Sequence, residues 1–88
     1  MTTQTRELLM ALKSSANQAT AYNAPILLGE SLNVDYKPDP EKCAAAGHYG
    51  GFLKAVMTGD KKLVWQLADE LNRQAIAHLI PEEIRAKY

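Results

Sequence analysis

Residues 38–60, PDPEKCAAAGHYGGFLKAVMTGD, decide the fold because they contain a helix start signal and a helix stop signal. Asp39 can cap free backbone N–H groups, and Pro40 fixes φ for the first helical turn. At the other end, Gly59 suits the left-handed conformation that ends many helices, and Asp60 can cap a following helix. The sequence therefore predicts a central helix between these signals, with another helix directly after it.

Glycines give the central helix its unusual side-chain pattern. Gly47 and Gly50 form a stripe of small residues with Cys43, beside a bulky stripe that includes Tyr49 and Phe52. A glycine inside a helix costs up to about 1 kcal/mol relative to alanine. The pattern therefore favours a surface that another helix approaches closely, in the same chain or in another one.

The same glycines leave a second interpretation open. If the central helix is continuous, it covers residues 40–58. If the chain instead unwinds at Gly50 and Gly51, it forms a turn and divides the helix into 40–47 and 51–58, because glycine readily adopts turn conformations. The continuous helix is the prediction.

The first third of the chain predicts one long helix and one short one. Helix 5–22 rests on apolar residues at helical spacing, namely Leu8, Leu9, Leu12, Ala16 and Ala19. Residues 1–5 are polar and expected to fray. Pro25 suits the first turn of a short helix near 25–32. The two prolines that follow predict an extended linker over 33–39.

The last third predicts a long amphipathic helix over 61–79. Its apolar residues recur at intervals of three and four, namely Val64, Leu67, Ala68, Leu71, Ala75 and Leu79. Trp65, Asn72 and Ile76 widen this apolar face beyond what one partner helix needs, which predicts contact with two neighbours or with another subunit. Pro81 ends the helix, and a short helix over 82–87 follows.

These elements predict an all-α fold, a small bundle of three main helices plus short helical segments in a single domain over 1–88. Ten basic and ten acidic residues give zero net charge, so no global field attracts nucleic acid or anionic membranes. A single cysteine excludes an internal disulfide framework. With no secretory signal or membrane-spanning stretch in this sequence, the expected compartment is the cytoplasm.

The sequence contains no set of residues typical of an active site. Cys43 and His48 are a possible nucleophile and base, but on one helix five residues separate them by roughly 140°. His48 and His78 are the only histidines and have no pattern of metal ligands around them. We therefore expect no enzyme activity, no metal site and no cofactor.

A degenerate helix-turn-helix over 52–72 offers an alternative. Ala55, Gly59 and Trp65 have separations that resemble the small, glycine and hydrophobic positions of that motif. Lys61, Lys62 and Gln66 could face DNA, but Asp69 and Glu70 would repel phosphate. A DNA-binding transcriptional regulator is thus the second hypothesis, and we expect no tight binding to nucleic acid.

The leading hypothesis is a non-enzymatic protein-binding module that acts as a regulator or inhibitor by docking on a partner protein. The absence of a catalytic set and the surplus of apolar and small-residue surface motivate it. We also expect a homo-oligomer, since 88 residues cover this surface poorly. A small enzyme is the third hypothesis. The predicted interface residues are Gly47, Tyr49, Gly50, Phe52, Trp65 and Ile76.

Overall fold

The computed structural model describes residues 1–31 and 39–88, and every regular element in these two ranges is helical. The elements are α1 (Thr3–Leu12), α2 (Gln18–Leu27), α3 (Pro40–Ala45), α4 (Gly51–Thr58), α5 (Lys61–Leu67), α6 (Glu70–Ile76), the 3₁₀ helix η1 (Ala77–Leu79) and α7 (Glu82–Lys87). The predicted all-α fold is therefore confirmed. Apart from Asp39, the predicted linker over 33–39 lies outside the described residues.

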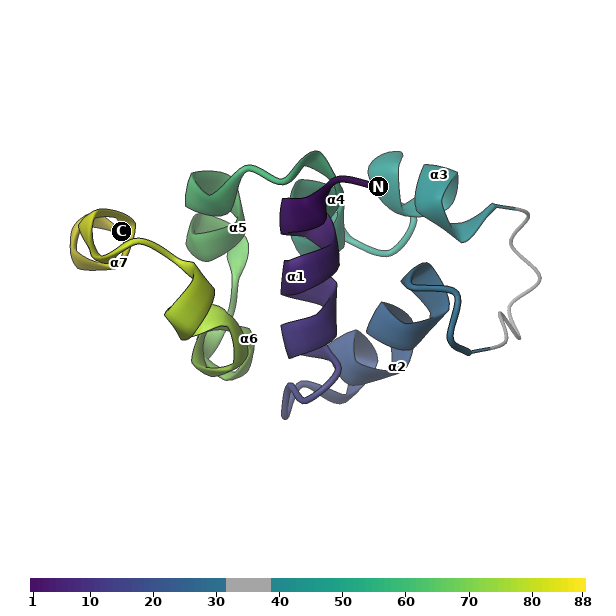
Figure 1. The fold of residues 1–88 in the computed structure, drawn as a ribbon, viewed down its shortest axis with the longest axis horizontal. Helices are drawn as coiled ribbons and strands as arrows, with labels where there is room; N and C mark the ends of the chain where they lie inside the picture. Colours follow the sequence, from purple (N-terminus) through teal and green to yellow (C-terminus); the bar gives the residue numbers. More distant parts are fainter. Residues whose placement is uncertain (32–38) are drawn as a thin grey trace.

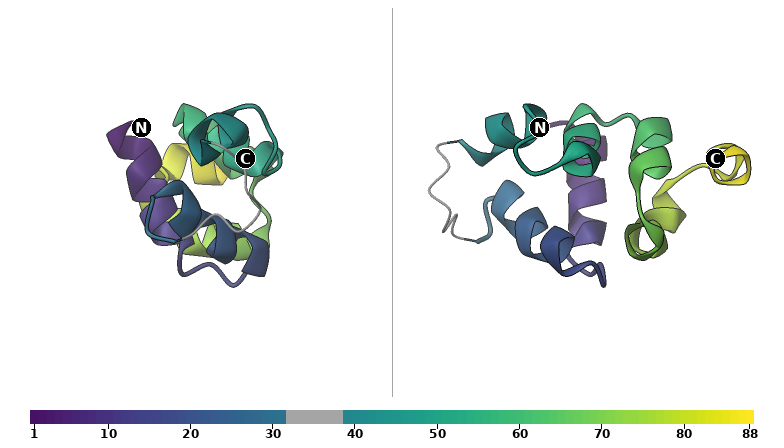
Figure 2. Two further views of the ribbon diagram at one scale, coloured as in Figure 1. Left: turned by 90° about the vertical axis from the view of Figure 1, so that its right-hand side faces the viewer. Right: turned by 180° about the vertical axis from the view of Figure 1, so that it is seen from behind.

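Helix α1 stands at the centre of the molecule. It packs against α2, α4 and α6, while α7 lies at one end beyond α5 (Figures 1 and 2). Burial of a leucine side chain stabilises a fold by about 1.5–3 kcal/mol, and Leu8, Leu9 and Leu12 of α1 are completely buried. Around them the other helices supply the rest of the core, including Leu53, Val56, Val64, Trp65, Ile76 and Ile80.

The start of α1 is fixed by threonine side chains. The helix begins at Thr3, two residues before the predicted start, and the Thr2 hydroxyl caps it by accepting from the Thr5 N–H at 3.1 Å. Thr5 is fully buried, and its hydroxyl donates to the main-chain oxygen of Val56 at 2.8 Å. Because a buried hydroxyl is costly without an acceptor, this bond holds the start of α1 against the end of α4.

None of the three long predicted helices is continuous. The ranges 5–22, 40–58 and 61–79 contain breaks before α2, before α4 and before α6, respectively. For the central helix, the interpretation with a turn at the glycines is thus confirmed and the continuous helix is wrong. The three-helix arrangement is replaced by shorter helices that change direction at each break (Figure 1).

Of the two short predicted helices, the one near 25–32 is wrong and the one over 82–87 is present. No separate helix begins at Pro25, because this residue lies inside α2, which continues to Leu27. The proline does not break α2, and the chain leaves the helix through a turn at Gly29, where φ is 77°. The predicted final helix over 82–87 is confirmed as α7.

Two of the breaks are bonded to each other. Asn17 caps α2 by accepting from the Thr20 N–H at 3.1 Å, and Asp69 caps α6 by accepting from the Asn72 N–H at 2.8 Å. The Asn17 amide donates to the Asp69 carboxylate at 2.7 Å, and the Ser15 hydroxyl donates to the Asn72 side-chain oxygen at 2.7 Å. These two bonds connect the start of α2 with the start of α6, so the break before α2 and the break before α6 lie side by side.

The central glycines allow backbone conformations with positive φ. The prediction that another helix of the same chain approaches them closely is wrong. Gly47 and Gly50 have φ of 93° and 101°, a region that other residues rarely adopt. A Cβ atom added to Gly50 would meet no heavy atom within 4 Å, and one added to Gly47 would meet only Lys54 Cδ, at 3.7 Å. The turn before α4, and not a tight contact, accounts for these glycines.

Two neighbouring glycine substitutions should therefore have opposite effects. Gly50→Ala should lower the free energy of unfolding by about 1–2 kcal/mol, because a side chain strains a backbone with positive φ. Gly51 has no positive φ and open space around it, so Gly51→Ala should raise stability by about 0.4–1 kcal/mol through the unfolded state. Urea denaturation of both variants measures this, and changes of the same sign would contradict the assignment.

Candidate functional site

A groove of about 260 Å³ lies between the start of α2, the turn before α4 and the break between α5 and α6. It collects three of the six predicted interface residues, Tyr49, Gly50 and Phe52. Sequence reasoning missed the opposite wall, where Leu67 from α5 and Asn72 from α6 line the same groove. Gly47 is half-buried and does not line it. The groove is the place where the predicted surface is best assembled.

The groove combines apolar and hydrogen-bonding walls. Tyr49 and Phe52 are half-buried, and Leu67 is 48% exposed. Asp69 is the only carboxylate among the described lining residues, and its two oxygens accept from the Asn72 main-chain N–H and the Asn17 amide. The groove is thus lined by apolar side chains and by one carboxylate, each of whose oxygens accepts a hydrogen bond within the chain.

Trp65 and Ile76 do not belong to this surface. Ile76 has no exposed surface and Trp65 is 7% exposed, so both side chains contribute to the core of their own chain. Leu67 and Leu71, which the periodic pattern places on the buried face, are instead exposed. Within α5 the buried residues are Val64 and Trp65, so Leu67 already lies off the buried face. For Leu71, the reason is the break at Ala68, whose ψ of 133° is far from helical and changes the rotational phase between α5 and α6.

The two residues considered as nucleophile and base are close neighbours along the chain, in α3 and in the turn after it. Cys43 lies in α3, and His48 lies in the turn after it, where its main-chain N–H donates to the Cys43 main-chain oxygen at 2.9 Å. Within the described ranges, no three Asp, Glu, His or Cys residues are grouped so that they could hold a metal ion. Nor does any helix described in residues 1–31 and 39–88 have the length and apolar character needed to cross a membrane.

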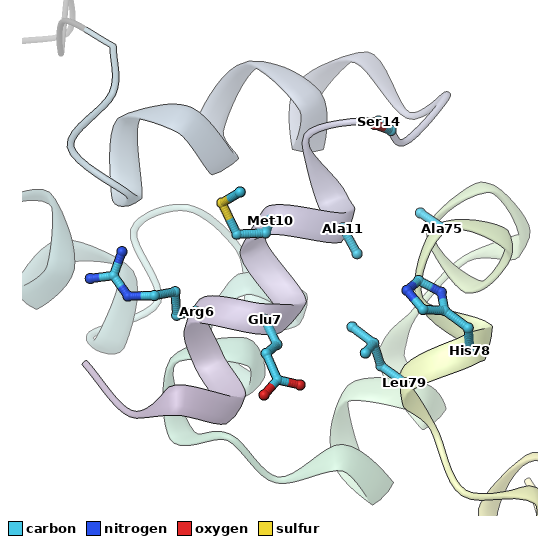
Figure 3. Close-up of a pocket in the computed structure, with 8 residues that line it drawn as sticks. All are labelled: Arg6, Glu7, Met10, Ala11, Ser14, Ala75, His78 and Leu79. Carbon is cyan, nitrogen blue, oxygen red and sulfur yellow. The ribbon is translucent and has the colours of Figure 1, made fainter.

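A larger, shallower groove of about 600 Å³ runs between α1 and the end of α6 with η1. Ala11 on α1 faces Ala75 and Leu79 across it, while Arg6 points to the other side of α1 (Figure 3). None of the predicted interface residues lines this groove. It serves below as a matched control surface.

The helix-turn-helix alternative has a counterpart in α4 and α5. Gly59 between them has φ of 76° and ends α4, and the Asp60 carboxylate caps α5 by accepting from the Lys62 and Leu63 N–H groups. The exposed side of α5 carries Leu63 and Leu67 together with Lys62 and Gln66. This face is therefore partly apolar, unlike a surface devoted to phosphate contacts.

No protein-family model matches this chain, and no curated protein or solved structure matches it with significance.

Proposed function

We propose that this protein is a non-enzymatic binding module that acts as a regulator or inhibitor by docking on a partner protein, and that it self-associates. The observation that supports this proposal is the groove in which Tyr49, Gly50 and Phe52 meet the exposed Leu67. Aromatic and aliphatic side chains at the rim of a preformed groove are typical of docking surfaces.

The core does not require a second copy. The chain exposes 5165 Å², and a monomeric protein of 9.7 kDa exposes about 5100 Å². The total exposed area is thus that of a monomer, and the proposal of self-association depends on particular exposed apolar residues instead. Leu63 and Leu67 are one turn apart on the same face of α5, next to the groove, and both are exposed. We therefore assign self-association to this face.

Light scattering at tens of micromolar tests self-association. The wild-type protein should have a mass of at least twice the 9.7 kDa of one chain, and Leu67→Lys should return it to one chain by placing a charge in the contact. Met10→Lys is the matched control, because Met10 is 46% exposed but lines the groove along α1. A wild-type mass near 9.7 kDa would exclude self-association.

The partner interaction is tested separately with the same variants. A protein that co-purifies with the wild type and with Met10→Lys, but not with Leu67→Lys, would be held by the proposed groove. Equal recovery with both variants would place its contact elsewhere. Circular dichroism should show that both variants keep the helical content of the wild type, since exposed substitutions change stability by less than about 0.5 kcal/mol.

The second candidate function is DNA binding through α4 and α5, which the left-handed turn at Gly59 favours. The exposed Asp69 and Glu70 follow α5 directly and oppose contact with phosphates. We expect no complex with duplex DNA tighter than about 1 µM at physiological salt, in the range of non-specific binding. A gel shift with random and native promoter fragments measures this. A sequence-specific complex with nanomolar affinity would favour a DNA-binding transcriptional regulator over the protein-binding module.

A further inference from the structure

Three basic side chains surround two aromatic rings at the α7 end of the molecule. The Arg73 guanidinium lies 4.6 Å from the centre of the Trp65 ring. The Lys62 and Lys87 ammonium groups lie 4.9 and 5.7 Å from the centre of the Tyr88 ring. These distances are within the range of cation–π contacts, so the five side chains form one cluster, which we call the basic aromatic cluster.

This cluster is rich in donors and poor in acceptors. Arg73 donates from Nε to the Trp65 main-chain oxygen and from Nη2 to the Tyr88 main-chain oxygen, both at 3.1 Å. Within residues 1–31 and 39–88, no carboxylate forms an ion pair with any of its three basic residues. The indole N–H of Trp65 is buried and has no acceptor among the described residues. A buried donor of this kind calls for an explanation.

Helix α7 covers this region with few contacts. It packs mainly against α5, and Ile84 is its only residue that is not exposed. No side chain caps its N-terminus, where Pro81 is extended. Tyr88 adds its ring against Lys62 and its main-chain oxygen to Arg73. An element held by so few contacts is among the first to open locally.

We propose that the surface of α5 and α6 beneath α7 is a docking site for an acidic segment of a partner protein, with residues 81–88 as a displaceable strap over it. The inference shares with the proposed function only the existence of a protein partner, since it uses a different surface from the groove. Charge complementarity supports it. A carboxylate would give Arg73 a charged acceptor beside the two main-chain oxygens to which it already donates. It would also add a negative charge near Lys62, on which Tyr88 and Asp60 already act, and charge-assisted hydrogen bonds are the stronger kind.

The cluster favours an acidic peptide over single-stranded nucleic acid, which also binds basic and aromatic surfaces. The Trp65 ring is buried and covered by Arg73, so it offers no open face for a base. Asp60, the exposed cap of α5, stays in place when residues 81–88 are displaced and would repel a continuous row of phosphates. One or two carboxylates can reach the basic residues without this repulsion.

The probe is a peptide of residues 82–88 that carries Arg85→Glu and Lys87→Glu, and the fluorescence of the single tryptophan reports its binding. The same peptide with glutamine at every glutamate should not bind. Arg73→Gln should weaken binding about tenfold or more. Tyr88→Ala, which loosens the strap, should strengthen binding several-fold, because less competing contact has to be displaced.

Lys62→Gln and Lys54→Gln form the matched pair, because both remove one exposed lysine and only Lys62 lies in the cluster. Lys62→Gln should weaken binding about threefold, and Lys54→Gln should leave it unchanged. Equal binding of the glutamine peptide, equal effects of the two lysine variants, or no gain with Tyr88→Ala would overturn the proposal. Tighter binding of a single-stranded oligonucleotide would also overturn it. A mass of Tyr88→Ala above that of the wild type, from exchange of α7 between copies, would overturn it as well. Leu67→Lys should bind the peptide as tightly as the wild type does, because Leu67 lines the groove and not the basic aromatic cluster. The peptide experiment therefore remains informative even if the groove proves not to bind a partner.

Discussion

Replacing Ile76 with alanine should lower the free energy of unfolding by about 2–5 kcal/mol. The side chain has no exposed surface and lies in the central core, so its removal leaves a cavity as well as losing buried apolar area. The stability of a domain of this length is on the order of 5–13 kcal/mol, and the variant should lose a large part of it. Urea denaturation followed by circular dichroism measures the change.

Leu67→Ala is the control for this result. The sequence pattern treats both residues as parts of one apolar helix face, but Leu67 is largely exposed. Its truncation should change the free energy of unfolding by less than about 1 kcal/mol. Similar losses for Ile76→Ala and Leu67→Ala would mean that the predicted continuous helix over 61–79 describes the protein better than the divided one.

The helix ends that were predicted correctly depend on local bonds. Asp39 accepts from the Lys42 N–H at 3.2 Å, and Asp60 accepts from the Lys62 N–H at 3.1 Å. In each case the capping residue and the N–H group that donates to it are two or three positions apart. The identity of the capping residue is therefore sufficient to predict the helix start from the sequence. Gly59 ends α4 for an equally local reason, its positive φ.

The breaks inside the predicted helices could not be derived in the same way. Asn17 and Asp69 are good capping residues, but a single capping residue in an apolar periodic run can also stand on an exposed helix face. In the structure these two residues each cap a helix start and are also bonded to each other, across 52 positions of the chain. Sequence periodicity contains no information on that pairing, so it gives the wrong rotational phase after each break.

The candidate site shows the same limit. Tyr49, Gly50 and Phe52 were found together because they are neighbours in the sequence, next to the turn that the glycines form. The apolar spacing over 61–79 places Leu67 on the buried face, but the face that α5 buries is centred on Val64 and Trp65. The local half of the groove could thus be predicted, and the half supplied by α5 and α6 could not.

The hydrogen bond between the side chains of Ser15 and Asn72 should make a large contribution to the free energy of unfolding, because both side chains are buried. Asn72 is only 3% exposed, and its side-chain oxygen accepts from the Ser15 hydroxyl at 2.7 Å across 57 positions of the chain. Asn72→Leu keeps the branched shape of the side chain but leaves the buried hydroxyl without this acceptor, which should cost about 1–3 kcal/mol. Ser15→Ala should cost a similar amount, and it also removes the acceptor of the Asn17 N–H.

Combining the two substitutions tests whether this bond joins the breaks. With both polar partners gone, neither is left unsatisfied, so the double variant should be more stable than the sum of the single losses by about 0.5–3 kcal/mol. Ser14→Ala is the control, because Ser14 is exposed and should combine additively with Asn72→Leu. Additive losses for Ser15→Ala and Asn72→Leu would show that the two residues do not stabilise the fold through each other. The paired breaks would then need another cause, such as the bond between Asn17 and Asp69, which a cycle of Asn17→Ala and Asp69→Ala measures in the same way.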